Sequence, residues 1–294
     1  MTKLFAVLFR FCLFMPEILT IIKGGRIMKR IIVLLTLVSL LVPGMIFAAR
    51  EKYKVVVVKN GGTIKGKVVS AEKIKDPVIP IKVKPKENPK ETEIEKKTCG
   101  STQQAMMYVL SPSNEVKNVL VIVEDVTEGM DVPKKDLNIN NVGCRFEPLV
   151  GISYVKSNYI IKNSDPILHN TSLGKMLDGD ARRSVYNLAL PFKDQVIEKP
   201  NRVDGLIDVK CDAHYWMRSY IYSAKNPYVA VTDDKGNFEI KDLLPGKYKV
   251  RFWHEGFEEV VKDIEVKAGA ATEADVTFKK AVTPAFITRI NEAG

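Results

Sequence analysis

The chain has 294 residues, of which 46% are hydrophobic and 27% are charged, a composition that is ordinary for a globular protein with a hydrophobic core. Its formal net charge is +10, but the first 49 residues hold six Lys or Arg residues against a single acid, Glu17, so about +5 remains without them. This charge is too weak to indicate nucleic-acid binding, and no basic helix or aromatic-basic stripe supports it. We exclude nucleic acid as a partner.

The clearest targeting signal lies near the N-terminus. Residues 28–49 have a basic start, an apolar run, a break at Pro43-Gly44 and small residues at the end, which is the layout of a secretory signal peptide. Because this signal begins at an internal Met28, we interpret residues 1–27 as a start-site artefact. The sequence predicts an exported protein in the periplasm, extracellular or at the cell surface. The alternative is an uncleaved segment that anchors the protein in the membrane.

Short β-branched runs separated by turn residues continue along the rest of the chain. Residues 53–58 and 63–69 flank Lys59-Asn60-Gly61-Gly62, which predicts a hairpin. Residues 72–98 are rich in Lys, Glu and Pro, so we expect a solvated loop or an extended connection there. The later strand-like runs are 116–126, 152–155, 159–161, 206–209, 220–222, 228–231, 238–240, 248–252 and 263–266.

This pattern predicts an all-β fold. No segment has a sustained helical period, which leaves room for one or two short helices, for instance at residues 102–108. Many short strands at regular spacing are typical of sandwiches and barrels, and the connections are too short for parallel crossovers.

Two of the three histidines lie in a context that is typical of a metal site. His169 comes where a strand-like run turns into a loop, and Cys211 and His214 share the loop after residues 206–210, with Met217 close behind. A thiolate, two imidazoles and a weak thioether are the ligand set of a mononuclear electron-transfer copper site. The sequence therefore predicts one copper per chain, with the ligands His169, Cys211, His214 and Met217.

The same region resembles the cupredoxins of plastocyanin type. The resemblance is carried by residues 163–165 ahead of His169-Asn170 and by the loop at 211–217. It implies a Greek-key β-sandwich over residues 139–226, in which Asn170 would hydrogen-bond the ligand loop.

The loop departs from the family in one respect. Single-copper members place four residues between the loop His and the axial Met, but only Tyr215 and Trp216 separate His214 from Met217. This short spacing resembles binuclear copper sites, which need a second loop cysteine that the chain lacks. We interpret the two aromatic residues mainly as packing against the loop. His254, the third histidine, lies in another set of strands and is interpreted as structural or interfacial.

Cysteine parity agrees with export. Removing the signal would take away Cys12 and leave three cysteines, an odd number for an oxidising compartment. One metal-bound thiolate, Cys211, and one disulfide between Cys99 and Cys144 would resolve the parity. The alternative is that Cys99 and Cys144 are both free and buried.

The C-terminal part has a second set of motifs. Thr232-Asp233 with Gly236 and Phe238, followed by Pro245-Gly246-Lys247-Tyr248, resembles the carboxypeptidase regulatory-like (transthyretin-like) β-sandwich. The strand that usually opens this module resembles residues 62–68, and its next strand resembles 118–123. We therefore predict a split sandwich of residues 53–130 and 227–280, with the cupredoxin-like domain inserted. Two domains in tandem are the alternative.

These features favour a one-electron carrier or relay that docks weakly and transiently with a redox partner protein. A non-redox copper chaperone or store, and a structural or carbohydrate-contacting β-sandwich without metal, are the other hypotheses. Zinc is the alternative metal for a Cys and His set. We expect no enzymatic activity, because the chain has no Ser/His/Asp signature, no placed carboxylate pair and no phosphate-binding glycine loop.

Overall fold

The computed structural model describes residues 52–177, 181–283 and 287. The expected all-β class is confirmed, because the described elements are strands apart from a single 11-residue helix, α4 (Pro89–Cys99). The predicted signal peptide at 28–49 and the segment 1–27 lie outside the described residues. Within the described part, no helix is long and apolar enough to cross a membrane.

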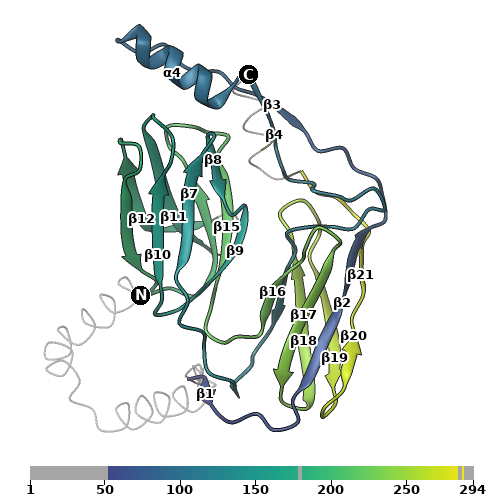
Figure 1. Ribbon diagram of the computed structural model, residues 1–294. Helices are drawn as coiled ribbons and strands as arrows, with labels where there is room; N and C mark the ends of the chain where they lie inside the picture. Colours follow the sequence, from purple (N-terminus) through teal and green to yellow (C-terminus); the bar gives the residue numbers. More distant parts are fainter. Residues whose placement is uncertain (1–51, 178–180, 284–286, 288–294) are drawn as a thin grey trace, which may run out of the picture. The chain divides into compact units, whose positions relative to one another are not determined.

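Two sheets form a sandwich from the middle of the chain (Figure 1). One sheet has the order β13 (Val196–Pro200), β10 (Asn158–Asn163), β7 (Leu137–Val142) and β8 (Arg145–Glu147). The other has the order β12 (Arg182–Leu190), β11 (His169–Met176), β14 (Gly205–Lys210), β15 (Arg218–Ala224) and β9 (Val150–Tyr154).

Alternating burial explains why these segments are strands. In β10, the side chains of Tyr159, Ile161 and Asn163 are buried, whereas those between them are half-buried. A period of two places every second side chain on one face of a sheet. Buried residues of both sheets, such as Ile139 and Ile207, belong to the same hydrophobic cluster.

The remaining strands form two further sheets. One has the order β16 (Val229–Val231), β5 (Leu120–Val123), β18 (Gly246–Trp253) and β19 (Val260–Val266). In the other, β17 (Asn237–Leu243) and β20 (Ala271–Glu273) flank β2 (Gly62–Ser70), which also pairs with β21 (Val276–Phe278). Thus β2 and β5, which precede the middle sandwich in the chain, are hydrogen-bonded to strands that follow it.

The predicted hairpin between residues 53–58 and 63–69 is wrong. Only Lys54–Val55 forms a strand, β1, and it pairs in parallel with β6 (Glu128–Gly129). Both edges of β2 are already occupied, by β17 on one side and by β20 and β21 on the other. No edge of β2 is therefore left for the preceding residues.

The segment expected to be a loop is partly regular. It contains α4 and the strand β3 (Val78–Pro80), which pairs with β4 (Thr102–Gln104) in antiparallel register. The short helix expected at 102–108 is therefore a strand followed by a turn. That turn is held by Asp76, whose carboxylate accepts backbone N–H bonds from residues 106–108 at 2.7–2.8 Å.

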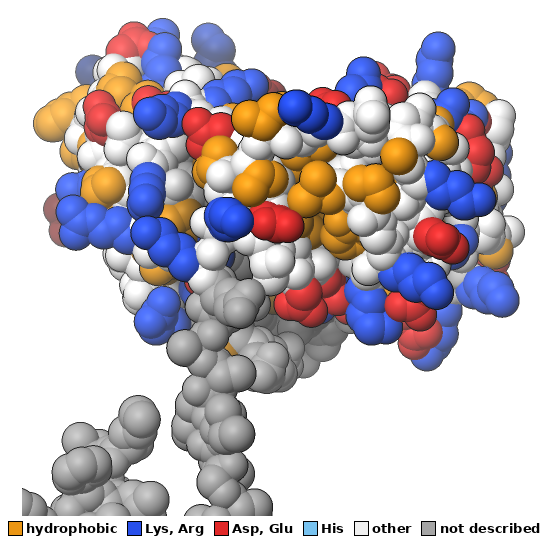
Figure 2. Space-filling view, turned by 90° about the horizontal axis from the view of Figure 1, so that it is seen from below, with side chains coloured by type: hydrophobic (Ala, Val, Ile, Leu, Met, Phe, Trp, Pro, Cys, Tyr) orange, Lys and Arg blue, Asp and Glu red, His pale blue; other side chains and the backbone are white. Residues whose placement is uncertain are grey.

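The face drawn in Figure 2 carries charged side chains of both signs. Lys and Arg side chains are mixed there with Asp and Glu side chains, and hydrophobic side chains lie between them.

Candidate metal centre

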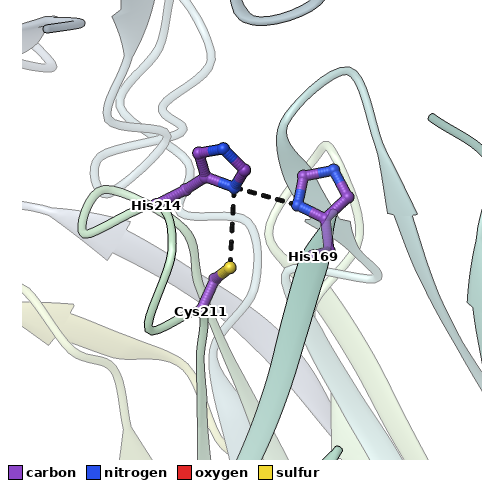
Figure 3. A group of neighbouring side chains, drawn as sticks. All are labelled: His169, Cys211 and His214. Atoms are coloured by element: carbon purple, nitrogen blue, oxygen red, sulfur yellow. Dashed lines mark hydrogen bonds between the residues drawn. The ribbon is translucent and has the colours of Figure 1, made fainter. Parts of the chain in front are cut away.

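Two neighbouring strands bring the candidate ligands together. His169 is the first residue of β11, and Cys211 directly follows β14. These strands are antiparallel partners, with Ser172 opposite Lys210, so the start of one lies beside the end of the other. His214 follows in the loop that leads to β15. Figure 3 shows the three side chains pointing toward one another.

The ligand atoms converge closely. Nδ1 of His169 and Nδ1 of His214 are 3.0 Å apart, and Nδ1 of His214 lies 3.6 Å from Sγ of Cys211 (Figure 3). The three residues offer donor atoms that all lie within 4.8 Å of one another. They are buried, with exposed fractions of 0% for His169, 1% for His214 and 3% for Cys211.

A carboxylate fixes the ring of His169. Its Nε2 lies 2.8 Å from Oδ2 of Asp165, so this nitrogen donates its proton and Nδ1 is left to face the other ligands. Asp165 also accepts the backbone N–H groups of Gly143 and Cys144 at 2.8 and 2.9 Å. Those two residues have φ of 57° and 56°, the conformation of a tight hairpin turn that points both N–H groups outward.

The same contacts control the ionisation of Asp165. Burial alone raises the pKa of a carboxyl group, but the hydrogen bonds from His169, Cys144 and Gly143 favour the ionised form more strongly. The pKa of Asp165 is therefore lowered. The loop that carries this residue is held by Asn163, whose Nδ2 donates to the carbonyls of Ile167 and Leu190 at 2.8 and 2.9 Å.

A second carboxylate, that of Glu95, contacts the ring of His214. Its Nε2 lies 3.3 Å from Oε1 of Glu95, on α4, and the other oxygen of Glu95 pairs with Nζ of Lys86. Burial, together with the neighbouring His169, lowers the pKa of His214 to about 4, although Glu95 opposes this shift. The ring is therefore neutral near neutral pH, the state in which an imidazole binds a metal.

The thiol is also held in place. The backbone N–H of Asn170 donates to Sγ of Cys211 at 3.3 Å, and its side-chain Oδ1 accepts the N–H of Asp212 at 3.4 Å. Burial raises the pKa of Cys211 despite the hydrogen bonds from backbone N–H groups. A cation is therefore needed to hold this buried sulfur as a thiolate near neutral pH.

The residues after His214 have different environments. Met217 is buried, and its backbone N–H donates to the carbonyl of His214 at 3.0 Å; its role as an axial ligand stays a prediction. The ring of Trp216 lies 5.1 Å from that of His214, and its Nε1 donates to the carbonyl of Cys144 at 3.1 Å. Tyr215 is 40% exposed, and its hydroxyl donates to the carbonyl of Pro80.

Cys99 and Cys144 form a disulfide with an S–S distance of 2.02 Å. Cys144 also lies near Asp165 and His169, but a disulfide sulfur is not a thiolate, so this second group is not a metal site. The disulfide joins the last residue of α4 to the turn that supports His169.

The donor set fits one metal ion. An ion about 2.0–2.3 Å from nitrogen and sulfur ligands holds trigonal ligand atoms roughly 3.5 Å apart, close to the 3.0 and 3.6 Å found here. One thiolate and two imidazoles suit copper or zinc, and fixing the second nitrogen of each imidazole is a general feature of metal-binding histidines. His254 lies apart from this group, among Phe257 and Phe278.

Comparison with known families identifies the C-terminal part. Residues 223–279 match the model of the carboxypeptidase regulatory-like domain. This part of the chain is a carboxypeptidase regulatory-like domain. Its sheets also take in β2 and β5 from before the matched segment. A search of curated proteins gives no match to the chain.

Cupredoxins are among the solved structures that match the chain. Amicyanin from Paracoccus versutus (Thiobacillus versutus) matches with a TM-score of 0.26 and 19% identity, over 32% of this chain and 86% of amicyanin. The copper-containing nitrite reductase from Thermus scotoductus SA-01 matches with a TM-score of 0.26 and 15% identity, over 33% of this chain. The match spans 24% of the length of that reductase.

Two residues that contact the candidate ligands, Asp165 and Glu95, were not predicted as site residues from the sequence. Asp165 lies four residues before His169 in a loop, a spacing that lets a carboxylate reach back to the ring. Glu95 lies more than a hundred residues before His214, and only the fold brings the two together.

Proposed function

We propose that the protein is an exported one-electron carrier that binds one copper ion through His169, Cys211 and His214. The observation that carries this proposal is the convergence of one Sγ and two Nδ1 atoms in a fully buried place. A thiolate with two imidazoles stabilises both oxidation states of copper, and copper bound there would supply reversible one-electron chemistry. Met217 is proposed as the weak fourth ligand.

The protein's own contribution is to hold the ligands still. Asp165 and Glu95 fix the two rings from behind, and the Asn170 N–H fixes the sulfur. Ligands that cannot rearrange keep the same geometry in both oxidation states, which lowers the energy needed to transfer an electron. The ligand residues are at most 3% exposed, and a buried site offers no open position for a substrate, which supports a carrier over an enzyme.

Two features support export. The disulfide between Cys99 and Cys144 is of a kind that persists in oxidising compartments such as the periplasm. The signal-peptide pattern at residues 28–49 agrees with this location. The partner we propose is a second redox protein that docks through a small, short-lived interface.

A second candidate function is a copper store or chaperone without redox turnover. The contact of α4 with His214 favours it, because a covered ligand exchanges electrons less readily with a partner. The two functions differ in the fate of the ion: a carrier keeps copper through many oxidation cycles, whereas a store or chaperone releases it to an acceptor.

The test is a Cu(II) titration of the purified protein, followed by visible absorption and electron paramagnetic resonance. We expect one copper per chain and an intense thiolate-to-copper absorption band. The band should be absent in Cys211→Ser and retained in His254→Gln, the matched control for a buried histidine outside the site. Tight zinc binding without a stable copper complex would replace copper by zinc in the proposal.

Redox cycling then separates the two candidates. We expect the band to bleach with one electron per copper and to return on oxidation without loss of metal. Loss of copper to a chelator upon each reduction would favour the store or chaperone.

A further inference from the structure

The helix α4 has well-defined ends and a buried face that is largely polar. Asn88 caps its first turn by accepting the N–H of Lys90 at 3.1 Å, and Pro89 stands at its first position. It ends at Gly100, whose φ is +74°. The residues that α4 buries are Thr92, Glu95 and Cys99, which lie on one face of a helix because of their spacing.

Glu95 is the central residue of this face. It is only 6% exposed, and burying a carboxylate is unfavourable unless charged or hydrogen-bonding partners compensate it. Its partners are Nζ of Lys86 on one oxygen and Nε2 of His214, 3.3 Å away, on the other. Lys86 is itself tied to the helix, because its N–H donates to Oγ1 of Thr92 at 2.9 Å.

The orientation of the His214 ring depends on this contact. Nε2 of the ring faces Glu95, and Nδ1 faces His169 and Cys211. A ring turned over would place a carbon atom at both of these positions. The contact with Glu95 therefore selects the orientation in which Nδ1 faces the other ligands.

The helix is also covalently attached. Cys99 at the end of α4 is bonded to Cys144, which sits in the turn whose N–H groups are held by Asp165. The element that supports His214 is thus fastened to the element that supports His169.

We propose that α4 is a cap on the metal site and that Glu95 is its positioning residue, which orients His214, shields it from solvent and adds a negative charge beside the site. This inference deepens the proposed function and rests on it for its redox consequence. The charged groups around the site are the Cys211 thiolate, Asp165, Asp212 and Glu95 against Lys86, so negative charge predominates there. A negative environment favours the cupric ion over the cuprous ion.

The first test needs no metal. The metal-free protein is treated with a histidine-acylating reagent, and modified residues are mapped by mass spectrometry. In the native protein we expect all three histidines to be protected. In Glu95→Ala, the modification rate of His214 should rise at least tenfold, whereas that of His254 should not change. Glu93→Ala is the matched control, because Glu93 is on the same helix but faces solvent.

The second test measures the copper potential in Glu95→Gln, which keeps the shape of the side chain and removes its charge. We expect the ratio of reduced to oxidised copper at a fixed electrode potential to rise about tenfold, which corresponds to about 59 mV for one electron. Glu93→Gln should leave the potential unchanged. A structural defect alone would broaden the copper signals without a directed shift.

The outcomes separate the cap from the proposed function. Absence of the thiolate-to-copper band in the native protein would overturn the copper function and leave the acylation test of the cap intact. A normal copper band with an unshifted potential in Glu95→Gln would overturn the charge effect of Glu95, and an unchanged acylation rate of His214 in Glu95→Ala would overturn its positioning role. Rapid acylation of His214 in the native protein would overturn the cap, and this holds even if the Glu95 variants fail to fold.

Discussion

The chain buries histidines in both of its sandwiches, and their surroundings differ in kind. In the middle sandwich, His169 and His214 turn their Nδ1 atoms toward each other, and each Nε2 meets a carboxylate. In the carboxypeptidase regulatory-like domain, His254 is also buried, but its Nδ1 accepts the N–H of Gly256 at 3.0 Å. Its ring packs 5.2 Å from that of Phe257.

The difference suggests a criterion for telling a candidate ligand from a structural histidine. Burial is common to all three, so burial alone decides nothing. What differs is the use of the two ring nitrogens: at the candidate site a carboxylate holds one and the other faces further donors, which is the arrangement of metal-binding histidines. In His254, the acceptor nitrogen Nδ1 is used in a hydrogen bond with the backbone N–H of Gly256, and the ring lies among aromatic rings.

The largest effect is expected where the two regions are joined. Arg218, next to Met217, donates to the carboxylate of Glu255 from Nε at 2.7 Å and from Nη2 at 2.5 Å, and both side chains are 5% exposed. Arg218→Met leaves the buried Glu255 without its positively charged partner, which should reduce the free energy of unfolding by about 3–5 kcal/mol. Denaturant unfolding measures this loss.

Two variants test the cause of that loss. The double variant Arg218→Met with Glu255→Leu should recover most of the stability, because no buried charge is left unpaired. Lys249→Ala breaks an exposed ion pair with Asp263 and should have no measurable effect. A double variant as unstable as Arg218→Met would show that packing, and not charge, carries the effect.

The gain in unfolding free energy on copper binding should differ between variants of His214 and His254. At a free copper concentration about 100 times the Kd, the native protein should gain about 2.7 kcal/mol of unfolding free energy. His254→Gln should gain the same amount, and His214→Gln should gain little. Unfolding curves with and without Cu(II) measure both. Equal gains in the two variants would mean that the comparison of ring environments does not predict the ligands.

The strands that the sequence predicted have clear physical signals. Residues 206–209 and 248–252 alternate or cluster β-branched and aromatic side chains, and both lie in strands, β14 and β18. In contrast, β12 and β13 were missed, because their exposed edges carry many charged and polar residues such as those of Arg182–Leu190. Edge strands bury little, so their sequences carry little periodicity.

Part of the candidate site could be predicted from the sequence, because some of its residues follow a local pattern. Cys211 and His214 are close in the chain, and His169 fits a known order of ligands, so all three could be named. The helix α4 was missed because its buried face is polar, which removes the apolar period of a helix. Its ends were nevertheless marked, by Asn88-Pro89 before it and Gly100 after it. No local pattern predicts that Glu95 reaches His214.

The pH dependence of the unfolding free energy tests whether His254 is buried and neutral in the folded protein. Burial and the nearby charge of Arg218 lower the pKa of His254 to about 3, whereas an unfolded chain binds a proton near pH 6.5. Between these values the unfolded state holds more protons than the native state, so stability falls as the pH falls. His254 should contribute about 1.4 kcal/mol per pH unit to this slope below pH 6. Unfolding of His254→Gln between pH 6 and pH 4 should show a correspondingly smaller slope, and an unchanged slope would argue against the neutral, buried ring.

The smallest effect compares two aspartates that each hold a turn. Asp233 accepts the N–H groups of Lys235 and Asn237, both at 2.8 Å, on the exposed surface of the regulatory-like domain. Asp165 holds the turn at Gly143-Cys144 in the same way but also holds His169. Asp233→Ala should therefore cost about 1 kcal/mol of unfolding free energy, the value of a surface turn.

The two aspartates should differ in their effect on copper. Asp233→Ala leaves every ligand in place, so the copper band and its affinity should not change. Asp165→Asn removes the charge that fixes His169 and should weaken copper binding by about 10- to 100-fold, as is usual when the partner of a metal-bound histidine is lost. Copper titration of both variants measures this. If Asp165→Asn bound copper as tightly as Asp233→Ala, a buried carboxylate behind a histidine would be no better guide to a metal site than an exposed one in a turn.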